Sequence, residues 1–276
     1  MEAKVQNWSE IYNNQILGKE IGEQIIEMIK KDGYATTHDG VYHADDIFCI
    51  SLIQICLKDN VEFVRTRQQT PYFTFDVGGG DFDHHTCDEY RWGDEGIFAS
   101  FGKLWCTLGR TLGLREEIWR EIDEQFVQPI DHTDNTGIMN PINFAINATK
   151  HRGIGESDGL LIARAMANEI LVELIESGLQ KSEELNKFYE EYEQHSKDSK
   201  ILHLSRHYTV DRGVYQSLGI DWITFPFNEE YTLQAVGNEV LKEEYCGLKN
   251  QGDIIFTHKG GWLAKGKTLE AVLGLL

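Results

Sequence analysis

The first half of the chain alternates short β-prone stretches with apolar residues at helical spacing. An apolar-leaning stretch from Gly33 to Thr37 precedes the segment Ala44 to Leu57, whose apolar residues follow the period of a helix. The segment Tyr72 to Asp76 has aromatic residues, a threonine and no helix-capping residue, so we expect a short strand that ends at the carboxylate. A helical pattern follows over Leu114 to Val127. This order predicts an α/β fold with a mostly parallel sheet flanked by helices.

The second half of the chain changes from helical patterns to short strands. Gly159 to Ser177 predicts a helix with an apolar face, and Ser182 to Lys197 predicts a polar helix that we interpret as a solvated face or a spacer. Further strands and a last helix are expected at Ile201 to Leu204, Ile220 to Phe225, Tyr231 to Val236, Asp253 to Thr257 and Thr268 to Leu275. We therefore expect two domains, with the helices and the parallel sheet in residues 1–197 and a smaller mixed α+β domain in residues 198–276.

Two polar clusters interrupt the first of these patterns. The run from Asp76 to His85 places two adjacent histidines after a glycine-rich bend, and the run from Thr37 to Asp46 holds two histidines and two consecutive carboxylates. Neutral imidazole and carboxylate together suit Mn, Fe, Co, Ni or Zn. Neither run alone has enough ligands for a two-metal centre, so we expect the two runs to share one site. Together they offer His38, His43, Asp45, Asp46, Asp76, His84 and His85.

A third polar cluster spans residues 128–137. Pro129 near its start and Gly137 at its end indicate a loop rather than the interior of a helix. We expect the carboxylate of Asp131 to complete the shell of a second metal. The alternative is that Asp131 and Asp134 only cap the segment that follows.

The charge balance limits the classes of partner. Lys and Arg number 26 against 45 Asp and Glu, and the resulting net charge of −19 argues against a tight, non-specific grip on long nucleic acid. The five cysteines form no Cys-x-x-Cys pair, so we expect reduced, buried thiols, with Cys87 a bystander beside the metal histidines. No apolar run reaches the roughly 18 residues of a membrane span. We expect a cytoplasmic protein.

Taken in order, these motifs resemble the MYG family of metal-dependent hydrolases, within the DHH phosphoesterase superfamily. The resemblance covers nearly the whole chain and rests on Thr37–Asp46, Arg65–Arg67, Asp76–Gly79, Asp83–His85, Glu95–Trp105, Asp131–Gly137 and Phe256–Trp262. The chain departs from the family pattern at Asp46, where glutamate is usual, at Gln68, where an acidic residue is usual, and in a shorter stretch between Asp76 and Asp83. These departures leave the expected ligands intact and concern the shape of the substrate entrance.

The resemblance implies a centre with two divalent cations, with Mn²⁺ expected first and Mg²⁺, Co²⁺ or Zn²⁺ as alternatives. One cation would be held by His38, His43 and Asp76, and the other by Asp45, Asp76, His84 and Asp131. Asp76 would therefore bridge the two. Two ions about 3.5 to 4 Å apart lower the pKa of a water, so that hydroxide attacks phosphorus and no covalent nucleophile is needed.

Two further residues are expected to act beside the metals. By the same resemblance, His85 would face the scissile phosphate and form a hydrogen bond with one of its oxygens. Asp83 would accept a hydrogen bond that orients a ligand imidazole.

Binding of an anionic substrate needs positive charge and hydrogen-bond donors in a site so rich in carboxylates. The candidates are Arg65, Arg67, His258, Lys259, Gly260 and Gly261. Lys259 lies beside two glycines, where backbone amides can approach a phosphate. The alternative for the two arginines is a solvated strand face with ordinary ion pairs. If the C-terminal domain folds over the metal centre, the cleft between the domains would be the active site.

Aromatic side chains offer a second way to hold a nucleic acid. Tyr42, Trp92 and Trp262 could stack on bases, although aromatic residues more often belong to a core.

Three functions remain in competition. The first is a two-metal phosphodiesterase that acts on nucleotides or short single-stranded nucleic acid, as an exonuclease from the 3' end if it follows the family's eukaryotic members. The second keeps the centre but hydrolyses a small compound, as a pyrophosphatase or a cyclic or dinucleotide phosphodiesterase, and the acidic composition favours this smaller substrate. The third is a non-enzymatic, metal-stabilised binding protein, which predicts a closed site with no open position. The sequence sets no oligomeric state.

Overall fold

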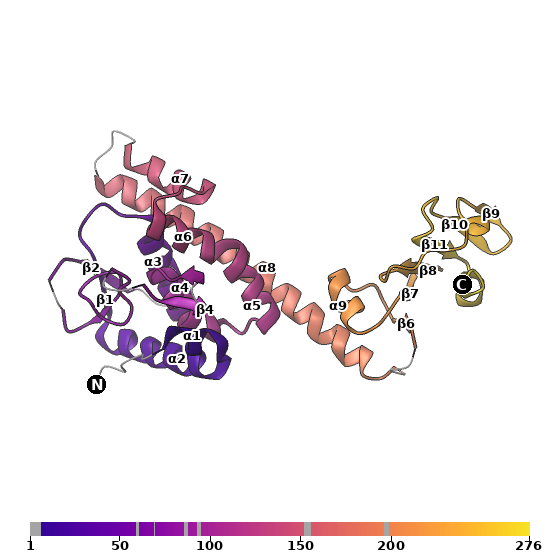
Figure 1. The fold of residues 1–276 in the computed structure, drawn as a ribbon, viewed down its shortest axis with the longest axis horizontal. Helices are drawn as coiled ribbons and strands as arrows, with labels where there is room; N and C mark the ends of the chain where they lie inside the picture. The colour runs from indigo at the N-terminus through magenta and orange to yellow at the C-terminus, as the bar shows by residue number, and fades with distance from the viewer. Residues whose placement is uncertain are drawn as a thin grey trace. The chain divides into compact units, whose positions relative to one another are not determined.

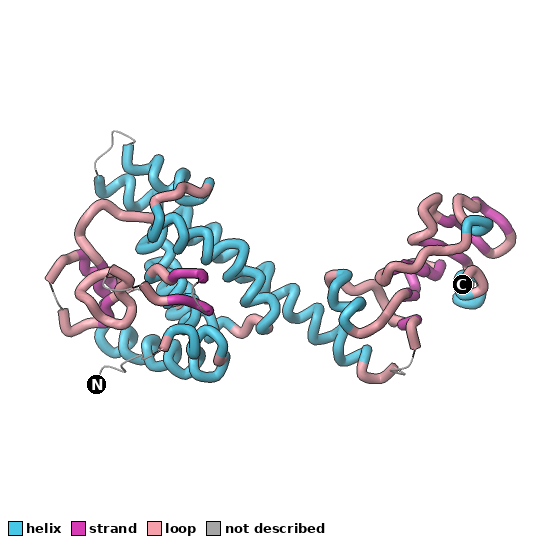
Figure 2. Tube along the Cα trace, viewed as in Figure 1, coloured by secondary structure: helices cyan, strands magenta, loops and turns pink. Residues whose placement is uncertain are grey.

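The computed structural model describes residues 7–58, 61–68, 70–85, 88–92, 95–151, 156–195 and 199–276. The chain divides into two compact units, Met1–Leu179 and Gln180–Leu276. Both units mix helices and strands, and helices make up most of the first (Figure 1, Figure 2). The expected boundary between residues 197 and 198 lies outside the described residues.

A small parallel sheet organises the N-terminal unit. Its central strand β1 (Tyr34–Thr37) pairs in parallel with β2 (Glu62–Arg65) on one side and with β3 (Phe73–Thr74) on the other. The expected α/β fold with a parallel sheet is therefore confirmed for this unit. A separate antiparallel ribbon is formed by β4 (Tyr90–Trp92) and β5 (Glu95–Ile97).

The helix after β1 is α3 (Ala44–Leu57), which has the bounds that the apolar spacing predicts. Its residues are buried on nearly every side, because the helices α2 (Gln15–Asp32) and α4 (Ser100–Thr107) pack against it. The short helix α1 (Trp8–Asn13) adds two buried aromatic residues to the same core. Gly18 and Gly22 let α2 approach α4 closely, since a Cβ at either position would clash with the carbonyl oxygen of Cys106 or Thr107.

The region expected to be a loop at residues 128–137 is a helix, so that prediction is wrong. The chain runs from α5 (Glu116–Ile122) through a π-helical turn, η2 (Asp123–Val127), into α6 (Gln128–Thr136). Pro129 lies in the first turn of α6, where the wider π-helical turn before it accommodates the missing N–H. Gly137 ends the helix in the left-handed region, with φ 73°.

The polar helix expected from Ser182 continues the apolar one. Both belong to α8 (Glu156–Tyr192), a single helix of 37 residues. The interpretation of its second half as a solvated face holds for one side of the helix only, because the other side is buried. Ser182, Leu185 and Phe188 are buried, and Phe188 packs in the core of the C-terminal unit. Three residues at helical spacing therefore give this charged segment a buried face.

The C-terminal unit is built on a mixed sheet with strand order β6-β7-β8-β11-β10-β9, which confirms the expected mixed α+β character. The strands and helices are β6 (Ile201–His203), α9 (Arg212–Ser217), β7 (Trp222–Phe227), β8 (Glu230–Ala235), β9 (Lys249–Gln251), β10 (Ile254–Thr257), β11 (Leu263–Gly266) and α10 (Leu269–Leu273). Only the pair β6 and β7 is parallel among these described strands. None of the described helices combines the length and apolar composition needed to cross a membrane.

Candidate metal centre

The ends of two neighbouring strands and the start of α3 bring the first two polar clusters together. His38 follows β1 directly, and His43 is the N-cap residue of α3. Asp45 and Asp46 lie in the first turn of α3 and are fully buried. The backbone N–H of His43 donates to Asp46 Oδ1 at 2.7 Å, which fixes this carboxylate at the helix N-terminus, where negative charge is stabilised.

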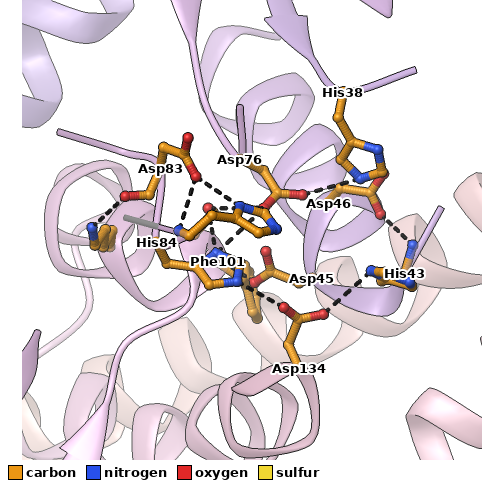
Figure 3. Close-up of polar contacts among 12 residues, drawn as sticks. His38, His43, Asp45, Asp46, Asp76, Asp83, His84, Phe101 and Asp134 are labelled. Carbon is orange, nitrogen blue, oxygen red and sulfur yellow. Dashed lines mark hydrogen bonds and ion pairs between the residues drawn. The ribbon is translucent and has the colours of Figure 1, made fainter. Parts of the chain in front are cut away.

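Asp76 lies at the middle of the centre and has an unusual backbone. Its φ of 57° is in the left-handed region, which costs free energy for a residue other than glycine and is typical of functional sites. The carboxylate faces histidines on two sides, as Figure 3 shows. Its Oδ2 lies 3.2 Å from His38 Nε2, and its Oδ1 lies 3.3 Å from His84 Nδ1. The two oxygens of one carboxylate thus serve two different groups of side chains.

Three groups of side chains each bring three potential ligand atoms within 4.8 Å of one another. They are His38 with Asp46 and Asp76, Asp76 with His84 and His85, and Asp45 with His84 and Asp134. Asp76 belongs to two groups and His84 belongs to two. The predicted sharing of one site by separate sequence clusters is therefore present in the structure.

The carboxylate of Asp45 lacks the partners that burial demands. Its Oδ1 accepts a hydrogen bond from the backbone N–H of Phe101 at 2.7 Å, at the start of α4. Its Oδ2 is buried and accepts no hydrogen bond from the described residues. Burial, together with the charges of Asp76, Asp134 and Asp131, raises the pKa of Asp45 well above its usual value. A buried oxygen without a donor among so many carboxylates fits a position that a cation would occupy.

His38, on the other side of Asp76, is also affected by the surrounding carboxylates. Hydrogen bonds to Asp46 and Asp76 raise the pKa of His38 to about 10, against 6.5 for an ordinary histidine. In the metal-free protein, His38 is therefore held in its charged form between two carboxylates. Metal binding through this ring must displace a proton.

Asp134 joins the centre, although the sequence did not single it out as a ligand. Its Oδ2 lies 2.9 Å from His84 Nε2, and its Oδ1 lies 3.5 Å from His43 Nδ1 (Figure 3). The alternative that Asp134 only caps a following segment is wrong, because it lies inside α6. A helical interpretation of residues 128–136 would have revealed it, since Asp131 and Asp134 are three residues apart and are neighbours on the helix surface.

Asp131 was expected to complete the ligand shell of the second metal, but it belongs to none of the three groups. Its Oδ2 accepts a hydrogen bond from Arg91 Nη2 at 2.6 Å, and its Oδ1 accepts one from the backbone N–H of Gly102 at 3.0 Å. Arg91 also pairs with Asp123 at 3.3 Å, and all three side chains are fully buried. A Cβ at position 102 would clash with both Asp131 and Arg91, so glycine is required there. The structure gives Asp131 an internal cation.

Asp83 and His85 lie together at the edge of the centre. His85 Nδ1 is 2.7 Å from Asp83 Oδ1, and the backbone N–H of Gly79 donates to Asp83 Oδ2 at 2.7 Å. Burial alone would raise the pKa of Asp83, but the hydrogen bonds from the backbone N–H groups of His85 and Gly79 outweigh it and lower the pKa. Asp83 thus orients His85, whose side chain is 58% exposed.

A buried lysine fixes the loop that carries these residues. Lys103 Nζ donates to the carbonyl oxygens of Asp81 and Asp83 at 3.1 and 3.0 Å and pairs with Glu89. The sequence places Lys103 in the segment Glu95–Trp105 and assigns it no role. In the structure, Lys103 positions the loop.

The two predicted substrate-binding arginines differ. Arg65 Nε donates to the carbonyl oxygen of His38 at 3.0 Å, and its Nη2 donates to that of Gly40 at 2.7 Å. Arg65 therefore holds residues 38–43, which we call the histidine loop, in place. Arg67 is 79% exposed and pairs with Asp39 at 2.9 Å. The expected alternative of an ordinary surface ion pair describes Arg67 in this structure.

The centre opens into a cleft of about 450 Å³. The residues that line it are His38, Gly40, Val41, His43, Arg67, Asp76, Val77, Gly78, Asp83 and His85. Six of these ten lining residues are ones that the sequence analysis assigned to the metals or to the substrate.

The predicted substrate segment of the C-terminal unit forms a tight turn after β10. His258 Nδ1 accepts a hydrogen bond from the backbone N–H of Gly260 at 3.0 Å, Gly261 has φ 69°, and Lys259 lies between them in the sequence. Trp262 is 43% exposed and its ring lies 4.7 Å from that of His258. Contact of this turn with a substrate stays a prediction.

Three smaller expectations complete the comparison with the sequence. Tyr42 is buried and its hydroxyl lies 2.7 Å from Thr149 Oγ1, so it belongs to the core and cannot stack on a base. Cys49 and Cys106 are buried and free, and Cys56 is free but only partly buried. Cys87 and the side chain of Trp92 lie outside the described residues.

Comparison with known proteins finds one family model that covers the segment with the candidate site. Residues 34–156 match the family model MYG1_exonuc, described as Uncharacterised protein family (UPF0160). A search of curated proteins found no match. Among solved structures the chain is similar to exonuclease RecJ bound to manganese, with 15% identity, a TM-score of 0.32 and coverage of 92% of this chain and 91% of that chain.

Two further similar structures are RecJ from Thermus thermophilus in complex with Mn²⁺ and with Mg²⁺. They show 13% and 14% identity and TM-scores of 0.30 and 0.28, and this chain covers 52% and 50% of their length. Scores of this size do not establish a shared fold, so the bound ions are properties of RecJ. Residues 34–156, which match the MYG1_exonuc family model, carry every side chain of the candidate metal centre.

Proposed function

We propose that this protein is a metal-dependent phosphoesterase that cleaves phosphodiester bonds of nucleotides or short single-stranded nucleic acid. The observation that carries the proposal is the position of Asp76, whose two carboxylate oxygens face His38 and His84 on opposite sides. A carboxylate shared in this way suits two neighbouring cations, and the match of residues 34–156 to the family model supports the same chemistry.

The residues present fit a pair of divalent cations. One cation would be held by His38, Asp46 and Asp76, and the other by His84 with Asp45, Asp76 and Asp134. In this assignment Asp134 takes the place first expected for Asp131, and His43 stays at the rim, where its ring contacts Asp134. When bound, two such cations lower the pKa of a water and draw charge from the phosphoryl oxygens. We propose Mn²⁺ or Mg²⁺, because carboxylate oxygens dominate the set.

His85 is the side chain best placed to exchange a proton with the substrate. Asp83 accepts a hydrogen bond from His85 Nδ1, so the proton of the neutral ring lies on Nδ1 and Nε2 is free. His85 lines the cleft and is more than half exposed. When Nε2 carries a proton as well, its N–H can donate to a phosphoryl or leaving oxygen, with Asp83 as the positioning residue.

A nucleotide or a short strand is the substrate that the site supports best. The cleft has room for a nucleotide. The net charge of −19 opposes a long polyanion, so any strand is held locally. As part of the proposal, the turn His258–Gly261 binds substrate phosphate, and cleavage proceeds as an exonuclease from the 3' end.

The same net charge also favours the second candidate, hydrolysis of a small compound such as pyrophosphate or a cyclic or dinucleotide. The cleft beside Asp76 and His85 favours an enzyme over a closed, purely structural metal site.

A substrate panel with one variant tests the proposal. Purified protein with Mn(II) should release nucleotides from a labelled single strand and p-nitrophenol from bis(p-nitrophenyl) phosphate, and Asp76→Asn should abolish both. The exposed variant Lys187→Gln serves as the matched control. Release of phosphate from pyrophosphate alone would move the assignment to the second candidate. Absence of turnover on every phosphoester with metal bound would contradict the proposal.

A further inference from the structure

A lysine that the sequence motifs do not include lies near the ring of Tyr42, the residue before His43. Lys150 is in the short 3-10 helix η3 (Thr149–His151), directly after α7 (Pro141–Ala148). Helix α7 packs against α3 and α6, the two helices that carry Asp45, Asp46 and Asp134 (Figure 1). The fold thus brings η3 to the same end of these helices as the carboxylates.

The helix η3, which carries Lys150, contacts the histidine loop. The hydroxyl of Tyr42, the residue before His43, lies 2.7 Å from Thr149 Oγ1. Helix α8 packs closely against η3 and Tyr42 at Gly159. A Cβ at this position would meet the carbonyl oxygen of Thr149 at 2.8 Å and the Tyr42 hydroxyl at 2.9 Å. Two hydroxyls and a close helix contact therefore fix η3 relative to His43.

Among the described residues, the partners of the Lys150 ammonium group are neutral. Its Nζ donates to Asn147 Oδ1 at 2.7 Å and lies 5.2 Å from the centre of the Tyr42 ring. Asn147 is itself oriented, since its Nδ2 donates to Met139 Sδ at 3.5 Å. No carboxylate of the described residues forms an ion pair with Lys150, although acidic residues outnumber basic ones in the chain by 45 to 26.

Other cations around the site are already engaged. Arg65 donates to two carbonyl oxygens, Arg67 pairs with Asp39, Lys103 pairs with Glu89, and Arg91 pairs with Asp131. Lys150 feels the charges of Asp46 and Asp134, which favour its protonated form, while partial burial lowers its pKa. It is thus a partly buried positive charge that lies near enough to Asp46 and Asp134 to feel their charges and that, within the described part of the chain, has no acidic partner.

We propose that Lys150 binds a phosphate oxygen of the substrate held at the metal centre. The inference rests on the proposed function and adds to it a specificity residue that the sequence motifs do not contain. An ammonium group has three N–H donors, of which Asn147 takes one, so two can reach non-bridging phosphate oxygens. The ring of Tyr42 and the amide of Asn147 hold Lys150 ready for this contact without neutralising it.

The test compares Lys150→Gln with wild type on a dinucleotide in the presence of Mn(II). Loss of a charge-assisted hydrogen bond should raise KM about 10-fold to 100-fold, while kcat changes by less than about threefold. Bound Mn(II) per chain and the Tm should stay as in wild type, and Lys150→Arg should restore KM to within about threefold. The control Lys187→Gln, an exposed lysine of α8 paired with Glu183, should leave KM unchanged.

An unchanged KM in Lys150→Gln would overturn the inference. A fall in Tm with KM unchanged would assign Lys150 a purely structural role and would overturn it as well. If Lys150→Gln does not fold, Lys150→Met keeps the aliphatic stem on Tyr42, and the same rise in KM is expected from it.

A binding measurement distinguishes failure of the proposed enzymatic function from failure of the inference about Lys150. If wild type hydrolyses no phosphoester, inorganic phosphate is added to the Mn(II)-loaded protein and Tm is measured. A phosphate-dependent rise in the Tm of wild type that is lost in Lys150→Gln would support Lys150 as a phosphate-binding residue. Equal shifts in the two proteins, or no shift in either, would overturn it.

Discussion

Two groups of carboxylates meet at α6, which contributes Asp131 to one and Asp134 to the other, and they differ in what balances their charge. Asp131 and Asp123 share the guanidinium of Arg91, at 2.6 and 3.3 Å. Among the described residues, Asp45, Asp76 and Asp134 form no ion pair with a lysine or an arginine, and their polar partners are imidazoles and hydrogen-bond donors. The first group is balanced by a guanidinium that stays charged, whereas the second faces imidazoles, whose protons a metal ion can displace. The comparison teaches that carboxylate density alone does not identify a candidate metal site; the lack of an arginine or lysine partner is the second sign.

The pKa shifts follow this difference. Burial raises the pKa of Asp131 to only about 6, because Arg91 opposes the effect. Burial and three neighbouring carboxylates raise the pKa of Asp45 well above its usual value, with a single backbone hydrogen bond against them. Helix α4 serves both groups, since Phe101 N–H donates to Asp45 and Gly102 N–H donates to Asp131. One helix N-terminus thus supports a structural ion pair and the candidate metal site side by side.

The largest expected effect is on catalysis. Asp76→Asn removes the shared carboxylate, so kcat/KM on bis(p-nitrophenyl) phosphate should fall by at least about a thousandfold, or roughly 4 kcal/mol of transition-state stabilisation. Steady-state kinetics at saturating Mn(II) measures it. Activity within tenfold of wild type would remove Asp76 from the centre.

The comparison is tested directly by Asp131→Asn against Asp134→Asn. Asp131→Asn leaves the buried Arg91 with only Asp123, so the free energy of unfolding should fall by about 3 kcal/mol with Mn(II) affinity nearly unchanged. Asp134→Asn should lower Mn(II) affinity about 10-fold to 100-fold with little loss of stability in the metal-free protein. Urea unfolding and Mn(II) titration measure the two effects. The reverse pattern would return Asp131 to the ligand set.

Removal of metal should destabilise the protein only through the group of Asp45, Asp76 and Asp134, and not through the group around Arg91. At Mn(II) 100-fold above its dissociation constant, each bound ion adds about 2.7 kcal/mol to the free energy of unfolding, so two independent ions add about 5.4 kcal/mol, and a chelator removes this increment. The same increment is expected in Asp131→Asn and should be much smaller in Asp134→Asn. An increment that Asp131→Asn abolishes would contradict the comparison.

The smallest effect is a pH dependence of the metal-free protein. The pKa of His38 is about 10 when folded and 6.5 in the unfolded chain, so its stabilising contribution is complete below pH 6.5 and is lost as pH rises toward 10. The Arg91 group contributes little slope in this range, because arginine stays charged and Asp131 is already largely ionised. Urea unfolding of chelated protein from about pH 6.5 to about pH 9.5 should show a fall in stability that His38→Gln reduces. An equal slope in His38→Gln would show that other groups cause it.

The sequence predicted the local elements of the site well, because they depend on periodicity. Ala44–Leu57 formed the helix that its apolar spacing indicated, and the carboxylate of Asp76 followed a strand as expected. The sequence analysis chose Asp131 rather than Asp134 as the ligand and expected a loop, because Pro129 and Gly137 are typical loop signals. In the structure, a π-helical turn lets the helix continue. Arg91 could not be matched with Asp131 from sequence, since the pair joins residues 40 apart through a β-ribbon. The buried side of α8 was hidden in a segment dominated by charge.

The central claim is that Asp45, Asp76 and Asp134, which form no ion pair with an arginine or lysine of the described residues, help to hold two metal ions, with Asp76 contributing to both sites. Equilibrium dialysis against Mn(II), followed by metal analysis of wild type, Asp76→Asn and Asp131→Asn, tests it most directly. Two ions per chain are predicted for wild type and Asp131→Asn, and fewer than one for Asp76→Asn. Binding of no Mn(II) by wild type, or of two ions by Asp76→Asn, would contradict the account.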